Sequence, residues 1–301
     1  MVQPSLWTIA SILKWTTQYF EKHTINTPRL DAELLLAKVL DCDRLSLYLN
    51  ADQPVQEEDR KSYRELIQRR LDGAPVAYLL GRREFWSMQL RVEPGVLIPR
   101  PDTETLVEAV CVQIKKWQTQ HPEEPCWILE LGTGSGAIPL ALCAECQNLR
   151  ILSTDISAIA IKTAAYNLSQ HTPSLAERQN EVLLIQGDRL EMIGADSRFN
   201  FLISNPPYVP SNAIPMLQKE IFIYEPIEAL DGGDDGLCFY RYLFEKGSTW
   251  LKEESQLFFE IGSDQEDALR ALAKSHSIWV LEEVILDIQS LPRVMRFRKH
   301  F

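Results

Sequence analysis

One short stretch follows the apolar run 199–203 and places an amide, two prolines and a phenol in succession, Asn205-Pro206-Pro207-Tyr208. Proline has no N–H, holds its own φ fixed and pushes the preceding residue toward extended backbone. The stretch should therefore be a stiff wall that mostly accepts hydrogen bonds. If the Asn205 side-chain oxygen and the Pro206 carbonyl each accept one N–H of a planar –NH2 group, they fix its nitrogen and stabilise its developing positive charge. Tyr208 would stack on that flat group, so the pattern predicts methyl transfer to a conjugated nitrogen.

A glycine-rich loop lies between an apolar strand and a helix, in the sequence Leu129-Glu-Leu-Gly-Thr-Gly-Ser-Gly136. Its glycines permit a tight turn and a close approach of the backbone to a ligand. The G-x-G-x-G spacing differs from the G-x-G-x-x-G that is typical of NAD enzymes. Glu130 adds a carboxylate where a cationic ligand is favoured. S-adenosylmethionine carries an ammonium and a sulfonium and suits the loop better than a dinucleotide; a loop needed only for packing is the alternative.

Two acids end the strands that follow. Asp155, at the end of the strand that contains Ile151-Leu-Ser-Thr, is placed to accept both hydroxyls of a ribose, or to cap the helix that begins at Ser157. Asp188, after the run 184–187, is placed at the height of an adenine edge or is a simple cap. Asp155 does not distinguish NAD from S-adenosylmethionine.

The glycine loop, the two acids and the stretch 205–208 each follow a predicted strand, so they can form one site only if a sheet brings the ends of these strands together. From residue 102 onward, helical periodicity alternates with short apolar strands, which predicts a doubly wound, mostly parallel α/β sheet with its ligand site at the carboxyl edge. The expected strands are 126–131, 149–154, 181–186, 199–204, 255–261, 278–287 and 293–299. The expected helices are 102–119, 135–146, 157–169, 236–251 and 264–274.

The first part of the chain has a different character. Helical patterns at 5–15, 31–40 and 57–71 and the absence of glycine before Gly73 predict a small helical domain over residues 1–84. Alternating residues around Pro94-Gly95 predict a β-hairpin linker over 85–100, which leaves 101–301 for the sheet domain. Two acids of the second helix, Asp31 and Glu33, are expected on a solvated face rather than as a catalytic pair.

Composition excludes several classes of protein. The 301 residues are 45% hydrophobic and carry a net charge of −11, which argues against a large footprint on naked nucleic acid. No window approaches the apolar length of a membrane span, and the N-terminus lacks a signal-peptide layout. Six scattered cysteines favour a reducing cytoplasm, with Cys143 and Cys146 read as small apolar residues on one helix. The five histidines show no metal-ligand spacing, so no metal site is expected.

In combination these motifs resemble the amino-group methyltransferases. The stretches 75–86 and 97–104 narrow the resemblance to the release factor glutamine N5-methyltransferases of the HemK/PrmC type, and 29–37 and 224–237 match the same family. The resemblance implies a seven-stranded, Rossmann-like class I methyltransferase domain that uses S-adenosyl-L-methionine. The implied acceptor is the glutamine of the Gly-Gly-Gln loop in class 1 peptide chain release factors. The implied location is the cytoplasm, and a monomer is expected.

The resemblance also implies roles for particular residues. The cofactor would be held by Gly132, Thr133, Gly134, Ser135, Gly136 and Asp155, with Asp188, Arg189 and Asn205 beside it. Asn205, Pro206, Pro207 and Tyr208 would hold the glutamine, with Asn205, Pro206 and Tyr208 in the catalytic role. Arg189 stands where relatives often carry an aromatic or apolar residue, and the segment 98–104 is implied to line the cofactor side.

The helical domain is implied to dock the protein substrate. A chain that starts near Glu84 is therefore expected to fold and bind the cofactor but to turn over full-length release factor poorly. Two alternatives remain open from the residues alone. One is a DNA adenine or cytosine amino-methyltransferase, because the same four residues can present a flipped base. The other is a binding module that keeps the fold without the chemistry.

Overall fold

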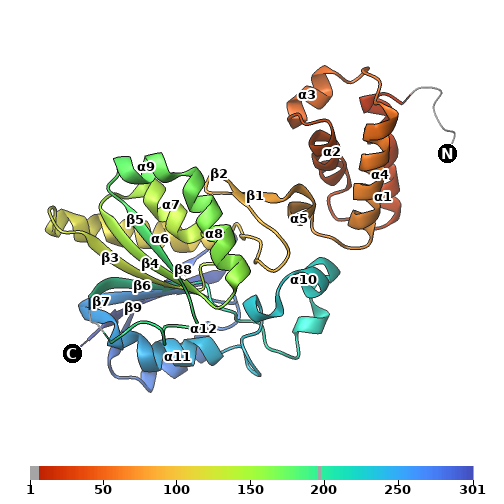
Figure 1. Cartoon of the computed structure of the whole chain (residues 1–301). Helices are drawn as coiled ribbons and strands as arrows, with labels where there is room; N and C mark the ends of the chain where they lie inside the picture. The colour runs from red at the N-terminus through yellow and green to blue at the C-terminus, as the bar shows by residue number, and fades with distance from the viewer. Residues whose placement is uncertain (1–6, 196–197, 301) are drawn as a thin grey trace. The chain divides into compact units, whose positions relative to one another are not determined.

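The computed structural model describes residues 7–195 and 198–300 and divides the chain into two units (Figure 1). The first unit contains the residues up to Arg82 together with Gln218–Tyr224, and the second contains Arg83–Leu217 and the residues from Glu225 onward. The segment 218–224 was expected in the sheet domain, yet its contacts place it with the helical unit.

The first unit is helical, as predicted. Thr8 begins α1 with a capping box, in which the Thr8 hydroxyl accepts from the Ser11 N–H and the Ser11 hydroxyl accepts from the Thr8 N–H. Pro28 begins α2 at the position where its missing N–H costs nothing. The apolar faces bury a core around Phe20, Leu35 and Tyr63. The helices are α1 (Ile9–Lys22), α2 (Pro28–Val39), α3 (Arg44–Leu49), α4 (Glu57–Leu71), α5 (Val76–Leu80) and α10 (Lys219–Tyr224).

The prediction of a solvated face for Asp31 and Glu33 is wrong. The two residues are only 3% and 2% exposed. Asp31 binds the Nε of buried Arg70 at 2.7 Å, and Glu33 binds Arg29 at 2.9 Å and Arg44 at 2.5 Å. A carboxylate can be buried when charged donors replace its water. Arg29 lies one helical turn before Glu33 on α2, but Arg44 and Arg70 come from other segments of the unit, where helical periodicity cannot indicate them.

The second unit is built on a seven-stranded sheet in the spatial order β5-β4-β3-β6-β7-β9-β8. The strands β3 to β7 are parallel, whereas β9 runs antiparallel to both β7 and β8. This sheet confirms the doubly wound fold. The strands are β3 (Cys126–Leu131), β4 (Leu149–Asp155), β5 (Glu181–Gln186), β6 (Phe199–Ser204), β7 (Leu251–Glu260), β8 (Trp279–Leu286) and β9 (Pro292–Lys299).

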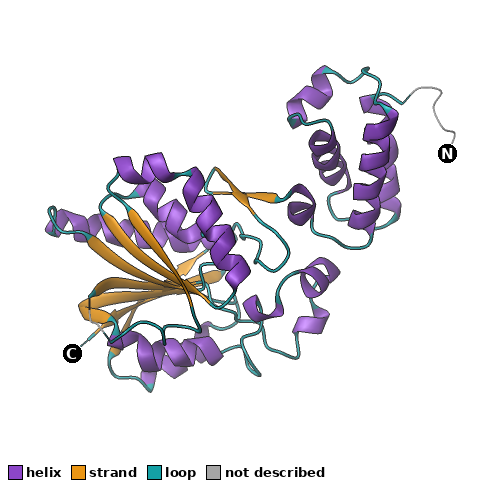
Figure 2. Ribbon diagram, viewed as in Figure 1, coloured by secondary structure: helices purple, strands orange, loops and turns teal. Residues whose placement is uncertain are grey.

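Helices cover both faces of this sheet (Figure 2). Because side chains alternate along a strand, Ile128 packs in a cluster with α6 and α7, whereas Leu129 packs in a second cluster with α11 and α12. Cys143 and Cys146 are buried free thiols in the first cluster, Cys143 on α7 and Cys146 directly after its last residue rather than on the helix as predicted. No helix in the described ranges is long and apolar enough to cross a membrane. The helices are α6 (Thr103–Gln120), α7 (Ala137–Glu145), α8 (Ala158–Gln170), α9 (Thr172–Glu177), α11 (Cys238–Lys246) and α12 (Glu266–Lys274).

The hairpin turns at a different place from the one predicted. Strands β1 (Arg82–Phe85) and β2 (Met88–Arg91) are joined by Trp86-Ser87, whose φ angles are 52° and 56°. Two left-handed residues make the tight turn that matches strand twist, and the Trp86 N–H donates to the Glu104 carboxylate at 2.9 Å. Pro94-Gly95 lies in a later turn. The Arg91 N–H also donates to the Asn167 side chain on α8 at 2.8 Å, so β2 belongs to the second unit rather than to a free linker.

One predicted helix is shorter than expected. The helical pattern over 236–251 gives α11 and a short 3-10 turn, Gly247–Thr249, because the chain enters β7 already at Leu251. Four short helices were not predicted, namely α3, α5, α9 and α10. Each has only five or six residues, too few for helical periodicity to be recognised.

Candidate functional site

A cavity of about 690 Å³ opens at the carboxyl edge of β3, β4 and β6, within the second unit. Parallel strands of this kind bind ligands at that edge. The lining residues are Gly95, Val96, Leu97, Leu131, Gly132, Gly134, Asp155, Ile156, Ser157, Ile159, Ala160, Gly187, Asp188, Arg189, Ser204, Asn205, Pro206, Pro207, Pro226, Glu228, Ala229, Asp231 and Phe239.

The glycine loop forms one wall of this cavity through backbone. The N–H groups of Gly132 and Thr133 both donate to the Thr154 carbonyl at 2.9 Å, which ties the turn to β4. Gly132, Gly134 and Gly136 have φ angles of 80°, 57° and 79°, in the left-handed region that favours glycine. A Cβ on Gly134 would meet nothing within 4 Å, so the backbone there is open to a ligand.

Three predicted cofactor-binding residues of this loop do not line the cavity. The side chains of Thr133 and Ser135 are buried, and Gly136 faces α8, where an added Cβ would lie 3.2 Å from the Ala164 Cβ. The spacing of the motif cannot separate the positions that face the cavity from those that close the turn against α8. These three residues shape the loop.

Asp155 lies at the end of β4 and lines the cavity, as expected of a ribose-binding acid. Its Oδ2 accepts the Gly134 N–H at 2.8 Å, and its Oδ1 accepts the Ser157 N–H at 2.9 Å. Burial raises the pKa of this carboxyl, while the two N–H bonds lower it. Asp155 is not the cap of α8, because the Ser157 hydroxyl itself accepts the Ala160 N–H. Each carboxylate oxygen keeps a lone pair for a hydroxyl.

Asp188 and Arg189 both line the cavity. The Asp188 side chain is 61% exposed and ends 3.9 Å from the Arg189 Nε. Arg189 has a φ of 52°, and its guanidinium lies over the rings of Phe239 and Tyr242, at 5.3 and 4.9 Å from their centroids. The cation–π pair with Phe239 therefore forms part of the cavity wall, where relatives were expected to place an aromatic or apolar side chain.

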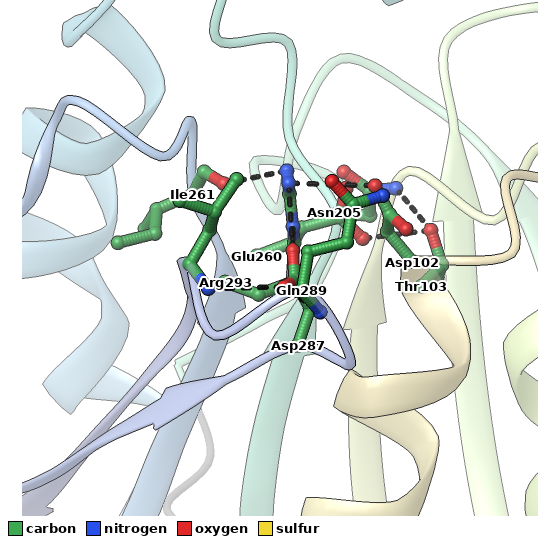
Figure 3. Close-up of polar contacts among 9 residues, drawn as sticks. Asp102, Thr103, Asn205, Glu260, Ile261, Asp287, Gln289 and Arg293 are labelled. Atoms are coloured by element: carbon green, nitrogen blue, oxygen red, sulfur yellow. Dashed lines mark hydrogen bonds and ion pairs between the residues drawn. The ribbon is translucent and has the colours of Figure 1, made fainter.

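The amide-and-proline stretch forms the opposite wall. Asn205, Pro206 and Pro207 line the cavity, and a Cβ added to Gly132 would lie 3.9 Å from the Asn205 carbonyl. The Asn205 Nδ2 donates to the Thr103 hydroxyl at 3.0 Å, and that hydroxyl donates to the Glu260 Oε2 at 2.7 Å (Figure 3). With its nitrogen bound to Thr103, the Asn205 amide keeps its oxygen for an incoming donor.

Tyr208 does not line the cavity. Its side chain packs against the cluster that contains Tyr240, and its carbonyl accepts from the Gln265 Nε2 at 3.0 Å. Burial raises the pKa of the Tyr208 hydroxyl to about 12, so the phenol is neutral. Stacking of Tyr208 on an acceptor group stays a prediction.

Glu130 does not face the cavity, contrary to the expectation that it would attract a cationic ligand. It is fully buried on the sheet face that packs against α7, because it alternates with Leu131, which lines the cavity. Burial raises the pKa of the Glu130 carboxyl to about 7, against the nearby hydroxyls of Ser153 and Thr133, which lower it.

Another acidic segment lines the cavity, and sequence reasoning did not single it out. Glu228 and Asp231 follow Pro226, and Asp231 is held in place by the Ser211 hydroxyl at 2.6 Å and the Gly233 N–H at 2.9 Å. The stretch 224–237 contains both acids and could have indicated them, because it matches the family that the sequence resembles. Together with Asp155 and Asp188 these acids give the described lining four carboxylates against one cation, Arg189. This imbalance fits a ligand that carries ammonium and sulfonium groups.

Metal chemistry has no matching donor set in the described residues. No group of three or more His, Cys, Asp or Glu side chains in that part of the chain is arranged to hold a metal ion.

Known protein families and proteins resemble this chain over most of its length. A family model described as the PrmC N-terminal domain matches residues 11–81, and one described as the methyltransferase small domain matches residues 117–235. The chain is 34% identical to the release factor glutamine methyltransferase of Rhodopirellula baltica over 97% of both chains. It is 38% identical to the protein of the same name from Xylella fastidiosa, over 88% of this chain and 91% of that one.

A solved structure supports the fold. The catalytic domain of hMettl16 superposes with a TM-score of 0.52 at 12% identity, over 79% of this chain and 82% of that chain. At that identity the likeness concerns the arrangement of sheet and helices alone.

Proposed function

Because the chain belongs to the family of release factor glutamine methyltransferases, we propose that it methylates the side-chain amide nitrogen (N5) of the Gly-Gly-Gln glutamine in class 1 peptide chain release factors. The observation that carries this proposal is the wall formed by Asn205 and Pro206. It presents an amide oxygen, fixed by Thr103, to the same cavity that the glycine loop borders.

We propose S-adenosyl-L-methionine as the methyl donor, which supplies an electrophilic methyl group when bound. The fit rests on the acidic lining of the cavity and on the open backbone at Gly134. Asp155 would accept the ribose hydroxyls, and Asp188 and Arg189 would border the adenine. Thr133, Ser135 and Gly136 would contribute by holding the loop in shape.

The acceptor amide is a weak nucleophile, because its lone pair is delocalised. Asn205 Oδ1 and the Pro206 carbonyl would each accept one of its N–H bonds, which orients the nitrogen and stabilises the charge that grows on it. Pro207 keeps this wall rigid, and Tyr208 would border the acceptor. Attack by the amide nitrogen would break the S–CH3 bond and release a neutral thioether, and the methylated nitrogen would then lose one N–H proton to water. No strong base is therefore needed before methyl transfer.

We place this activity in the cytoplasm and propose that the protein works as a monomer without direct DNA binding. Free thiols at all six cysteines and the net charge of −11 support the location and the lack of DNA binding. Light scattering measures the oligomeric state.

The direct test is to incubate the protein with methyl-labelled cofactor and either a class 1 release factor or DNA. The expected result is one methyl group on the Gly-Gly-Gln glutamine, located by peptide mass spectrometry, and no label in DNA. Label in DNA, or label elsewhere in the release factor, would refute the assignment.

Replacement of Asn205 tests the acceptor wall. Asn205→Ala should lower kcat by on the order of 100-fold or more, because one preorganised dipole at the reacting nitrogen is lost. Cofactor affinity, measured by calorimetry, should stay within about threefold, since the glycine loop and Asp155 are untouched. A variant that loses cofactor binding yet turns over normally when saturated would contradict this role.

A further inference from the structure

A chain of polar groups leads from the cavity wall into the protein interior (Figure 3). Asn205 Nδ2 donates to Thr103 Oγ1 at 3.0 Å, and Thr103 Oγ1 donates to Glu260 Oε2 at 2.7 Å. Thr103 is 4% exposed and Glu260 1% exposed. Neither lines the cavity, so neither would touch a substrate there.

The direction of these bonds follows from chemistry. An ionised carboxylate only accepts hydrogen bonds, and a threonine hydroxyl has one proton to give. When Thr103 donates that proton to Glu260, its oxygen can only accept from Asn205. The Asn205 amide must then present its NH2 group to Thr103, and its oxygen is left for the cavity.

We propose that Thr103 and Glu260 are positioning residues, and that the carboxylate of Glu260 sets the direction in which the Asn205 amide points. The inference rests on the proposed function, because it concerns the acceptor that holds the substrate amide. With the direction reversed, Asn205 would present N–H groups to the N–H groups of its substrate, and the wall would repel what it should hold.

The surroundings of Glu260 hold the pKa of its carboxyl near neutral pH, so a small change of pH changes its protonation. Burial raises the pKa of its carboxyl to about 7, against the bond from Thr103 and the charge of Arg293, which lower it. Arg293 binds Asp287 at 3.1 Å and Asp102 at 3.4 Å. The titratable and charged groups around Glu260 are Arg293 from β9, Asp102 before α6, Asp287 after β8, Tyr208 after β6 and Tyr240 from α11.

The sign of the pH effect follows. Below pH 7 Glu260 gains a proton and becomes able to donate to Thr103, which frees the Thr103 proton for the Asn205 oxygen. The acceptor wall is then lost, so kcat should fall as the pH drops through about 7. Neither a glutamine amide nor a sulfonium titrates in this range, so the fall must come from the protein.

Paired substitutions at Thr103 test the positioning role in the full-length protein, assayed on release factor above pH 8. Thr103→Val keeps the shape of the side chain and removes the hydroxyl that links Asn205 to Glu260. It should lower kcat by on the order of 100-fold, with KM and cofactor affinity changed by no more than about threefold. Thr103→Ser keeps the hydroxyl and should retain most of the activity. Equal activity of the valine and wild-type proteins, or equal losses in both variants, would overturn the inference.

The pH profile of kcat tests the role of Glu260. The wild-type profile should have an acidic limb near pH 7, and Glu260→Gln, which cannot ionise, should lack it. Glu130→Gln is the matched control, because it removes a second buried carboxyl with a pKa of about 7 that has no contact with Asn205, and it should keep the limb. A limb that persists in Glu260→Gln, or vanishes in the control, refutes the inference. Wild-type protein that methylates no release factor would instead refute the proposed function.

Discussion

Two carboxyl groups of the second unit, Glu130 and Glu260, are shielded from water yet differ in their partners. Glu260 accepts the Thr103 hydroxyl at 2.7 Å and lies in the field of Arg293, whereas no cation opposes the burial of Glu130. Both have a pKa of about 7. Burial of a carboxylate is costly, and it shifts both groups toward the protonated form relative to an exposed carboxyl, which ionises near pH 4.5.

The cost of ionising Glu130 should be visible in stability. In the folded protein the pKa of Glu130 is about 7, above the ordinary value of 4.5. The stability that the protonated carboxyl contributes is therefore fully present below pH 4.5 and is lost as the pH rises through 7. Relative to wild type, Glu130→Gln should therefore gain about 2–3 kcal/mol of unfolding free energy between pH 5 and pH 8. Denaturant unfolding at the two pH values measures this gain. Glu123→Gln, at an exposed position, is the control, and an equal gain there would contradict the prediction.

At the scale of elements, the glycine loop and α8 determine each other's position. Gly136 has a φ of 79°, and a Cβ added there would lie only 3.2 Å from the Ala164 Cβ, whereas Gly134 has a φ of 57° and open space around it. The Asn167 side chain on α8 donates to the Ser135 carbonyl at 2.8 Å, which joins loop and helix at a second point. The loop therefore depends on α8 for its shape. The Gly134 N–H donates to the Asp155 carboxylate, so each of these two residues holds the other in place.

The two glycines should respond differently to alanine. Gly136→Ala combines backbone strain with a clash against Ala164 and should cost about 2–4 kcal/mol of unfolding free energy. Gly134→Ala, the matched control in the same loop, adds strain alone and should cost about 1 kcal/mol. Chemical denaturation compares them. Equal costs would mean that α8 gives way to the added methyl group.

A second element, α10, belongs to the helical unit, whereas the chain before it and after it belongs to the second unit. Its Glu220 binds buried Arg70 of the helical unit at 2.7 Å. The chain enters α10 soon after the wall at 205–207 and leaves it at Glu225, just before the acidic lining at 226–231. A chain that starts near Glu84 would leave Glu220 without the Arg70 partner. We therefore expect such a truncation to disturb the segment that leads into 226–231, as well as to remove the proposed docking surface.

At the scale of the whole molecule, recognition of a protein substrate needs more surface than one side chain offers. Specific protein interfaces bury on the order of 1,200 Å² or more. The helical unit is our proposed source of that surface. Its short helix α3 leaves Leu45 and Leu49 65% and 75% exposed, beside Tyr48 at 47%. Large apolar side chains grouped in this way are typical of interaction sites.

Charge placed on α3 should separate docking from chemistry. Leu45→Lys with Leu49→Lys should lower kcat/KM on full-length release factor by about tenfold or more, because apolar contact area is replaced by charge. Turnover of a short Gly-Gly-Gln peptide should change little. Val112→Lys, at a position 50% exposed on α6, is the control and should leave both values unchanged. Equal losses on protein and peptide would show that α3 has no docking role.

Much of the molecule followed from local patterns. Periodicity located the strands from β3 to β6 within a residue, because each contains a short apolar run bounded by turn residues. The motifs likewise indicated a glycine loop, Asp155 and Asn205 at one sheet edge, since parallel strands bring their carboxyl ends together. These features depend on neighbours in the chain, so they can be read from one sequence.

The tertiary structure decided which groups meet. Thr103 and Glu260 are 157 residues apart, and nothing near either one indicates that together they orient Asn205. The burial of Asp31 depends in the same way on Arg70, 39 residues away, and the place of Glu130 on the face turned from the cavity depends on the sheet as a whole. Such pairs form because packing replaces the water around a polar group with one specific partner, and the choice of partner is made by the fold rather than by local sequence.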